Sequence, residues 1–167
     1  MGRKLLETAI RARPLTRLAD RTWRVLCGVN AGAAEVEALS ALAFSIGEGR
    51  VIVECARTDF ARMLGRCELS VSQGGYNTVM EMLQARTRAV VVPFAGGAET
   101  EQTLRTGLLA KLGLIDMVEE TGLEPRTLAG VVNRAADRPR RSGAGIDLHG
   151  AQTSADWILQ WDSEKQW

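Results

Sequence analysis

The stretch that decides the fold is ELSVSQGGYNTVMEMLQARTRAVVVPFAGGAETEQ, residues 68–102. It starts with an apolar strand around Leu69 and Val71, turns at residues 72–75, and continues as a helix. A second strand follows at residues 89–94. Strands that alternate with helices predict a parallel sheet covered on both sides.

The turn Ser72-Gln73-Gly74-Gly75 is the first candidate binding element. A strand that stops at a Gly-Gly turn leaves backbone amides and the N-terminus of the next helix facing outward, where their partial positive charge suits a phosphate or diphosphate. Taken alone, such a turn is equally compatible with a tight connection that binds nothing.

The helix after this turn carries polar side chains at helical spacing. Asn77 and Thr78 add hydrogen-bond donors in its first turn. Glu81 follows them by four and three residues, so a helix puts all three on one side. Its carboxylate can accept hydrogen bonds from ribose hydroxyls, although a Glu at this place in a helix is often only a solvated acid.

The second strand delivers another polar cluster, Glu99, Glu101 and Gln102. Parallel strands present their carboxyl ends at one edge of a sheet, so this cluster is predicted beside the Gly-Gly turn, in reach of sugar hydroxyls. The acidic residues are also compatible with the first turn of a helix that Thr100 caps. Gln102 is therefore a stronger candidate than Glu101.

The ordered motifs SVSQGGYNTVME (70–81), Val92-Pro93-Phe94 and Glu101-Gln102 resemble the C-terminal donor-binding domain of GT-B glycosyltransferases, in particular family 28. That family includes the bacterial transferase that adds N-acetylglucosamine to a lipid-linked cell-wall precursor. The similarity spans residues 22–136. It implies one half of a GT-B fold, whose other half is an N-terminal acceptor domain.

The resemblance also implies roles for individual residues. The donor would be bound by Ser72, Gln73, Gly74, Gly75, Asn77, Thr78, Glu81, Glu101 and Gln102. Within this set Glu81 would hold the ribose, and the Glu101-Gln102 pair would contact the transferred sugar. Backbone near Ala56 and Arg57 would contact the base edge. No catalytic residue, cofactor or metal is implied for this chain.

The function implied is the nucleotide-sugar-binding half, with a UDP-sugar donor, of an enzyme that transfers a hexosyl group to a hydroxyl acceptor. We expect this chain alone to be inactive without the acceptor domain or a partner subunit, because Ser72 has no nearby His and no Gly-x-Ser-x-Gly elbow occurs. The alternatives are half of a sugar-nucleotide epimerase, or a non-catalytic nucleotide-binding module. A Gly-x-Gly-x-x-Gly fingerprint and a P-loop are both missing, which argues against NAD and ATP.

The rest of the chain continues the alternation of helix and strand. The motif helix is predicted to end near Arg86, with further helices at 2–12, 33–43, 59–64, 101–112 and 124–136, and strands at 23–29, 50–54 and 115–118. Residues 137–150 are predicted to form a loop that leads to a helix at 153–161, where Trp157 and Trp161 share one face. We expect one domain, 1–167, with a doubly wound, Rossmann-like parallel sheet that lacks its first strand, since a helix comes first.

Composition is that of an ordinary globular domain: 167 residues, 46% hydrophobic, 25% charged and net charge +1, which argues against nucleic acid as a partner. Arginines concentrate near both ends, where a solvated face is favoured over contact with an acidic membrane. Three cysteines with no close pairing fit a reducing interior, and the lone His149 is not expected to bind metal. We expect a cytoplasmic protein, or one peripheral to the inner face of the membrane, with some homo-oligomerisation through exposed apolar surface.

Overall fold

The computed structural model describes residues 2–96, 100–140 and 150–164. Its strands are β1 (Trp23–Cys27), β2 (Val51–Cys55), β3 (Ser70–Gln73), β4 (Ala89–Val92) and β5 (Asp116–Met117). Its helices are α1 (Arg3–Ala12), α2 (Ala33–Ile46), α3 (Phe60–Arg66), α4 (Tyr76–Gln84), α5 (Glu101–Lys111), α6 (Pro125–Asp137) and α7 (Gly150–Glu164). Two short 3-10 helices, η1 (Arg13–Leu15) and η2 (Glu120–Gly122), were not predicted.

The predicted alternation of helices and strands is confirmed, with differences at the ends of elements. The strand predicted at 89–94 stops at Val92, because Pro93 has no backbone N–H to donate to a ladder. Asp137, predicted to lie in a loop, is the last residue of α6. Residues 141–149 of that loop, which include His149, lie outside the described residues, as does Glu99 of the polar cluster, and Gly150 is the first residue of α7.

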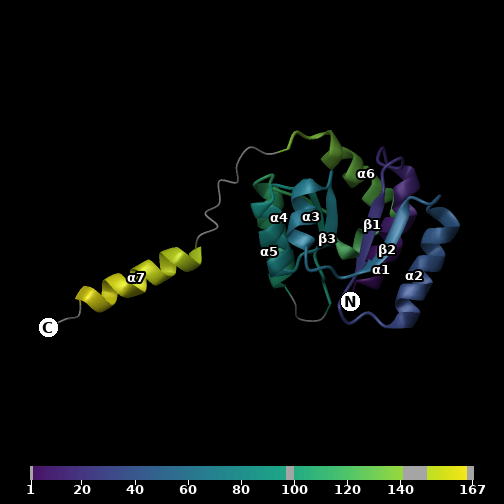
Figure 1. Ribbon diagram of the computed structural model, residues 1–167. Coiled ribbons are helices and arrows are strands. Elements are labelled where there is room, and N and C mark those ends of the chain that lie inside the picture. The colour runs from purple at the N-terminus through teal and green to yellow at the C-terminus, as the bar shows by residue number, and fades with distance from the viewer. Residues whose placement is uncertain (1, 97–99, 141–149, 165–167) are drawn as a thin grey trace.

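All described strand pairs are parallel, as predicted. They form two sheets, one of β1 and β2 and the other in the order β3-β4-β5. Figure 1 shows α2 on the side of the first sheet, with α3, α4 and α5 gathered on the side of the second. The α/β architecture therefore follows the expectation, but β1 and β3 are not joined by a ladder.

Strand β4 is the centre of the core. All four of its residues are buried, and successive side chains point to opposite faces of the sheet. Val90 and Val92 belong to a cluster that α1 and α6 complete, whereas Ala89 and Val91 belong to a cluster with residues of α3, α4 and α5. The valine run is thus buried on both faces, as in a parallel sheet covered on both sides.

The β1–β2 sheet has its own apolar cluster. Ile10 of α1 and Leu39 of α2 pack there on Val25 and Cys27 of β1. Next to this cluster Arg13 is fully buried. Its guanidinium donates hydrogen bonds to the carbonyl oxygens of Ala19 and Ile46, and the distance to the Ile46 oxygen is 3.3 Å. It also donates to the Glu48 carboxylate at 2.9 Å. A buried cation therefore ties α1 to the end of α2.

Helix α7 is longer than the predicted 153–161 segment and extends away from the sheets in Figure 1. Its apolar side chains Trp157, Ile158, Leu159 and Trp161 are all exposed. Among the described residues, no helix is both long enough and apolar enough to cross a membrane.

Candidate functional site

The Gly-Gly turn connects β3 directly to α4. Gly74 is buried, and Gly75 is the N-cap of α4 with φ −58° and ψ 141°. No side chain caps the helix there, so its first-turn amides remain available to an anion. Ser72 and Gln73 were predicted in the turn but belong to β3, because they pair with Val91 and Val92 of β4.

Gly74 sits at a close contact between β3 and α5. A Cβ at this position would lie 2.8 Å from the Thr106 hydroxyl and 3.3 Å from the Gln102 side-chain oxygen. The same Gln102 oxygen accepts a hydrogen bond from the Phe94 amide at 3.2 Å. Gln102 therefore joins the turn after β3 to the loop after β4, and the structure brings these two predicted elements together.

Arg105 is a site residue that the sequence analysis missed. Its guanidinium donates to the Gly74 carbonyl oxygen at 3.0 Å, lies 5.3 Å from the centre of the Tyr76 ring, and forms an ion pair with Glu101. Through its hydrogen bond to the Gly74 carbonyl, this guanidinium stabilises the turn, and it adds positive charge near the N-terminus of α4. The signal was its place on α5, one turn after Glu101.

Helix α4 presents the remaining candidates on one side, as its spacing predicted. Asn77 is exposed and Thr78 is half-buried, both in the first turn of α4, and Glu81 is half-buried one turn later. Ser72 is turned elsewhere, since its hydroxyl donates to the thioether sulfur of Met82 with 3.6 Å between Oγ and Sδ. Glu101 keeps 75% of its side chain exposed despite the ion pair with Arg105.

The candidate base contacts lie in the other sheet. Ala56 and Arg57 follow β2 and are exposed, and within the described ranges no hydrogen bond or ion pair links them to Gly74 or Gly75. Arg57 pairs with Glu54 at 3.0 Å and with Asp59 at 2.8 Å. Its hydrogen bond lowers the pKa of Asp59, and hydrogen bonds from Arg24 and then Arg57 lower the pKa of Glu54.

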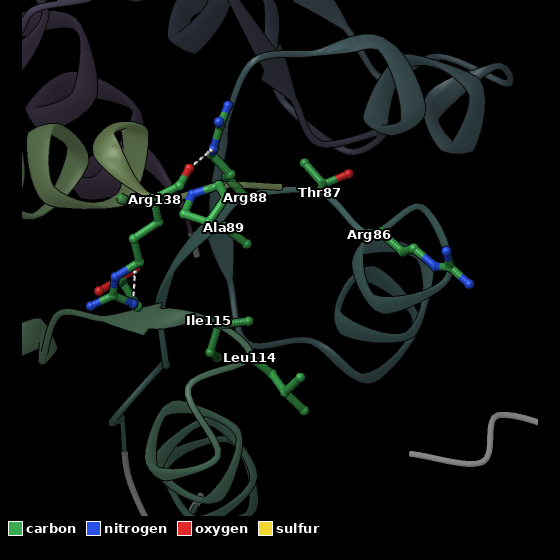
Figure 2. Close-up of a pocket in the computed structure, with 10 residues that line it drawn as sticks. Arg86, Thr87, Arg88, Ala89, Leu114, Ile115 and Arg138 are labelled. Atoms are coloured by element: carbon green, nitrogen blue, oxygen red, sulfur yellow. Dashed lines mark hydrogen bonds and ion pairs between the residues drawn. The ribbon is translucent and has the colours of Figure 1, made fainter. Parts of the chain in front are cut away.

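A small cavity lies far from this edge. Arg88 and Ala89 at the start of β4 line it, together with Leu114, Ile115 and Arg138, as Figure 2 shows. Its volume of about 20 Å³ has room for roughly one water molecule. It lies at the amino ends of the strands, opposite the Gly-Gly turn, and is too small for a nucleotide.

Metal chemistry finds no support in the described part of the chain, where no group of three or more His, Cys, Asp or Glu could hold an ion. Cys27, Cys55 and Cys67 carry free thiols. Burial raises the pKa of the Cys27 and Cys67 thiols, so both favour the neutral form. The site consists of amides, side-chain donors, carboxylates and one arginine, which suits a phosphorylated sugar-like ligand.

Sequence comparisons find relatives of this chain among bacterial glycosyltransferases. The chain is 30% identical over 106 residues to the UDP-N-acetylglucosamine--N-acetylmuramyl-(pentapeptide) pyrophosphoryl-undecaprenol N-acetylglucosamine transferase of Syntrophotalea carbinolica, a match that covers 61% of this chain and 29% of that protein. It is 28% identical over 83 residues to the enzyme of the same description from Anaeromyxobacter sp. (strain K), covering 50% of this chain and 22% of that protein. The chain thus matches less than a third of the length of these relatives.

Solved structures show the same fold. The crystal structure of Acinetobacter baumannii MurG matches with a TM-score of 0.69 at 20% identity, over 94% of this chain and 46% of that one. The glycotransferase of kitacinnamycin matches with a TM-score of 0.67 at 22% identity, over 92% of this chain and 38% of that one. Residues 50–147, which include the Gly-Gly turn and Gln102, match the model of the glycosyltransferase family 28 C-terminal domain. The chain therefore belongs to the glycosyltransferase family 28 C-terminal domain family.

Proposed function

We propose that this chain is the donor-binding half of a glycosyltransferase, which holds a UDP-sugar while its hexosyl group is transferred to a hydroxyl acceptor. The observation that carries the proposal is the junction of two loops at one sheet edge. The side-chain oxygen of Gln102 accepts a hydrogen bond from the Phe94 amide and also lies close to Gly74. Both contacts are beside the uncapped N-terminus of α4. The names of the relatives support a uridine diphosphate donor.

In this proposal the diphosphate lies against the turn and the first amides of α4. Negative charge grows on the diphosphate as the sugar leaves, and fixed amide dipoles stabilise that charge without reorganising. Arg105 holds the Gly74 carbonyl group, so it keeps the turn in place and brings a cation close to the leaving group. Asn77 and Thr78 add donors, while Glu81 holds the ribose and Glu101 with Gln102 the sugar.

The acceptor site is proposed to lie on a second domain or subunit. We propose that the catalytic base for the acceptor hydroxyl also lies there, since the described residues around the turn include no histidine and the Ser72 hydroxyl donates to Met82. The relatives' names specify a lipid-linked acceptor. For an acceptor of that kind, we propose that the chain works in the cytoplasm at the inner face of the membrane.

Calorimetric titration tests the donor site directly. The chain is titrated with UDP, UDP-N-acetylglucosamine, GDP and TDP, and the UDP titration is repeated with Glu81→Ala. We expect selective binding of the uridine nucleotides and about 10- to 150-fold weaker binding after the substitution, because a hydrogen bond to a charged group is worth roughly 1.5–3 kcal/mol.

Glu37→Ala is the matched control, since Glu37 is an exposed carboxylate on α2 beside the other sheet. Its affinity for UDP should equal that of the unchanged chain. Equal binding of all four nucleotides, or equal losses from Glu81→Ala and Glu37→Ala, would contradict a uridine site at the Gly-Gly turn.

A further inference from the structure

Two cysteines that are far apart in the sequence end neighbouring strands. Cys27 is the last residue of β1, and Cys55 is the last residue of β2. The parallel ladder places them directly opposite each other, in the same register as Val25 and Val53. Neighbouring strands lie about 4.8 Å apart, which is within the roughly 4.4–6.8 Å that separate the Cα atoms of a disulfide. The backbone therefore holds the two cysteines at a distance that a disulfide can bridge.

Both cysteine side chains lie on the same face of the sheet. Side chains alternate along a strand, so Cys27 shares its face with Val25, and Cys55 shares its face with Val53. Val25 and Val53 both pack in the apolar cluster that also contains Cys27. Burial raises the pKa of the Cys27 thiol, and the charges of Glu35 and of a Cys55 thiolate raise it further. An electrostatic effect of Cys55 on Cys27 agrees with two thiols that are close together.

The two thiols differ in their access to solvent. Cys27 has only 1% of its surface exposed, whereas Cys55 is exposed. A reagent in solution can therefore reach Cys55 first, and Cys27 then reacts with what is bound beside it. An accessible thiol next to a second thiol is the arrangement in which one cysteine reacts with an oxidant and the other resolves the product.

We propose that Cys27 and Cys55 are a reversible oxidation site, which forms a disulfide between the ends of β1 and β2 by exchange with a small-molecule disulfide. The Cys55 thiolate attacks one sulfur of the small disulfide, whose S–S bond breaks and releases one small thiolate. The Cys27 thiol then loses its proton and attacks the Cys55 sulfur, which releases the second small thiolate. Two electrons pass from the protein thiols to the small disulfide, and the two protons end on the two released thiols.

The position of the pair favours a bond that forms and breaks readily. Side chains on one face of neighbouring strands keep their Cβ atoms about 4.8 Å apart, whereas the Cβ atoms of a disulfide are roughly 3.5–4.5 Å apart. Closing the bond therefore draws the two strand ends together. The residues that follow, Gly28 and Ala56, are exposed and lie beyond the ladder, so they can follow this movement. Disulfides that are exposed or distorted in this way are the ones that are easily reduced.

The bond would also act on the loop that follows β2. Ala56 and Arg57, the candidate contacts to the base, come directly after Cys55. Movement of the Cys55 backbone toward β1 shifts these two residues, so oxidation should weaken the binding of UDP. This consequence rests on the proposed function, whereas the bond itself depends only on the position of the two thiols.

Intact-mass measurement on the folded full chain tests the bond. The reduced chain is incubated at low protein concentration with a fixed ratio of oxidised to reduced glutathione, and the remaining thiols are alkylated with iodoacetamide. We expect the chain to lose the mass of two hydrogens and to keep one thiol for alkylation. Trypsin cleaves after arginine, so residues 25–50 and 51–57 should then be released as a pair that a reductant separates.

Variants of the cysteines assign the two roles. Cys55→Ala should leave Cys27 reduced, because the oxidant does not reach the buried thiol. Cys27→Ala should instead keep glutathione on Cys55 as a mixed disulfide, since the thiol that would release it is gone. Cys67→Ala is the matched control. It removes a thiol that donates to the Leu64 carbonyl oxygen at 3.4 Å, and the Cys27–Cys55 bond should form as in the unchanged chain.

Other products would overturn the proposal. A bond from Cys55 to Cys67, disulfide-linked dimers, or glutathione on Cys55 with Cys27 still reduced would each show that the folded chain does not bring the two thiols together. The same incubation in urea checks that the fold is responsible, and we expect about 10-fold less of the Cys27–Cys55 bond there, because unfolding lowers the effective concentration of one thiol at the other. Equal yields in the folded and unfolded chains would also overturn it. Cys55→Ala replaces an exposed side chain, so it keeps the test decisive even if Cys27→Ala does not fold.

UDP titration of the reduced and oxidised chains separates this site from the proposed function. Weaker binding after oxidation that a reductant restores, and that oxidant does not cause in Cys55→Ala, would support both. A Cys27–Cys55 bond in a chain that binds UDP in neither state would uphold the oxidation site and defeat the donor site. Equal UDP affinity in the two states would contradict the shift of the loop after β2.

Discussion

The two sheets of this protein are built from the same units but differ in how the chain holds them together. The β3–β4–β5 sheet has β4 at its centre with every residue buried between two apolar clusters. The β1–β2 sheet has Ile52 exposed, and charged contacts lie around its apolar cluster, among them the Arg24–Glu54 pair and buried Arg13. The β3–β4–β5 sheet thus forms the hydrophobic centre, whereas the β1–β2 sheet combines a smaller apolar cluster with charged groups around it.

This difference explains why most of the residues that match the family model belong to the β3–β4–β5 side. Backbone that must approach a ligand or another helix allows few residue types, and the Gly74–Gly75 turn and Gln102 meet that requirement on the β3–β4–β5 side. The β1–β2 side needs only apolar residues at the right spacing and one buried cation. Many sequences satisfy the second demand, which fits a family match that begins at residue 50.

The largest effect on stability is expected from Arg13→Ala, on the β1–β2 side. It leaves a cavity and removes the donors to the carbonyl groups of Ala19 and Ile46, so we expect the free energy of unfolding in urea to fall by about 3 kcal/mol. Arg17→Ala is the control, because the Arg17–Asp137 pair is exposed and should contribute less than about 1 kcal/mol. Similar losses from both would mean that Arg13 is not what secures this sheet.

A smaller loss is expected from Gly74→Ala on the β3–β4–β5 side. The new Cβ would lie 2.8 Å from the Thr106 hydroxyl, which forces β3 and α5 apart and should cost about 2 kcal/mol. Gly75→Ala meets nothing within 4 Å and should cost about 0.5 kcal/mol, the difference between Gly and Ala at an N-cap. Chemical denaturation compares the two, and equal losses would show that the turn and α5 are not in close contact.

Thr106→Val should instead stabilise the same region. The Thr106 hydroxyl is buried and has no hydrogen-bond partner among the described residues, so a methyl group of the same shape removes a polar atom that nothing satisfies. We expect a gain of about 1 kcal/mol in thermal or urea unfolding. Thr103→Val, at an exposed position of the same helix, should change stability little. A loss for Thr106→Val would indicate that the hydroxyl does have a partner in solution.

The smallest effect concerns the charged cluster at the end of β2, formed by Glu54, Arg57 and Asp59. The pKa values of Glu54 and Asp59 are lowered in the folded chain, so their stabilising contribution is present above their ordinary values near 4.5 and 3.8 and is lost as pH falls below them. Arg57→Ala should therefore flatten the decrease in stability between pH 5 and 3, by only a small amount because water screens this cluster at the protein surface. Urea unfolding at several pH values measures it, with Arg126→Ala as an exposed control that should keep the original slope.

Much of the fold was predictable from local patterns. Each local pattern indicates one local structure: apolar residues at helical spacing in α1 and α6, a run of valines in β4, and a turn at Gly74-Gly75. The structure has these elements in the predicted order. The bounds were less predictable, because Ser72 and Gln73 join a strand only when β4 is there to pair with them. Local propensity does not include that partner.

The residues around the candidate site divide in the same way. Gln102 and the glycines have a recognisable motif around them, so their neighbourhood could be predicted from sequence. The pairing of Arg105 with Glu101 could be predicted from their spacing on one helix, but its contacts with the Gly74 carbonyl and the Tyr76 ring could not, because these groups lie 31 and 29 residues away along the chain. The hydrogen bond from the Ser72 hydroxyl to the Met82 sulfur could not be predicted from the sequence either.

By itself, the sequence determined the class of fold, the order of its elements and the family, because hydrophobic periodicity and glycine punctuation act over a few residues. The two-sheet arrangement of the strands, the burial of Arg13 at the end of α2 and the contact of Arg105 with the Gly-Gly turn could be seen only in the tertiary structure. Each of these features depends on contacts between groups that are distant in sequence. Such contacts form only when the chain packs, so a local sequence pattern does not predict them.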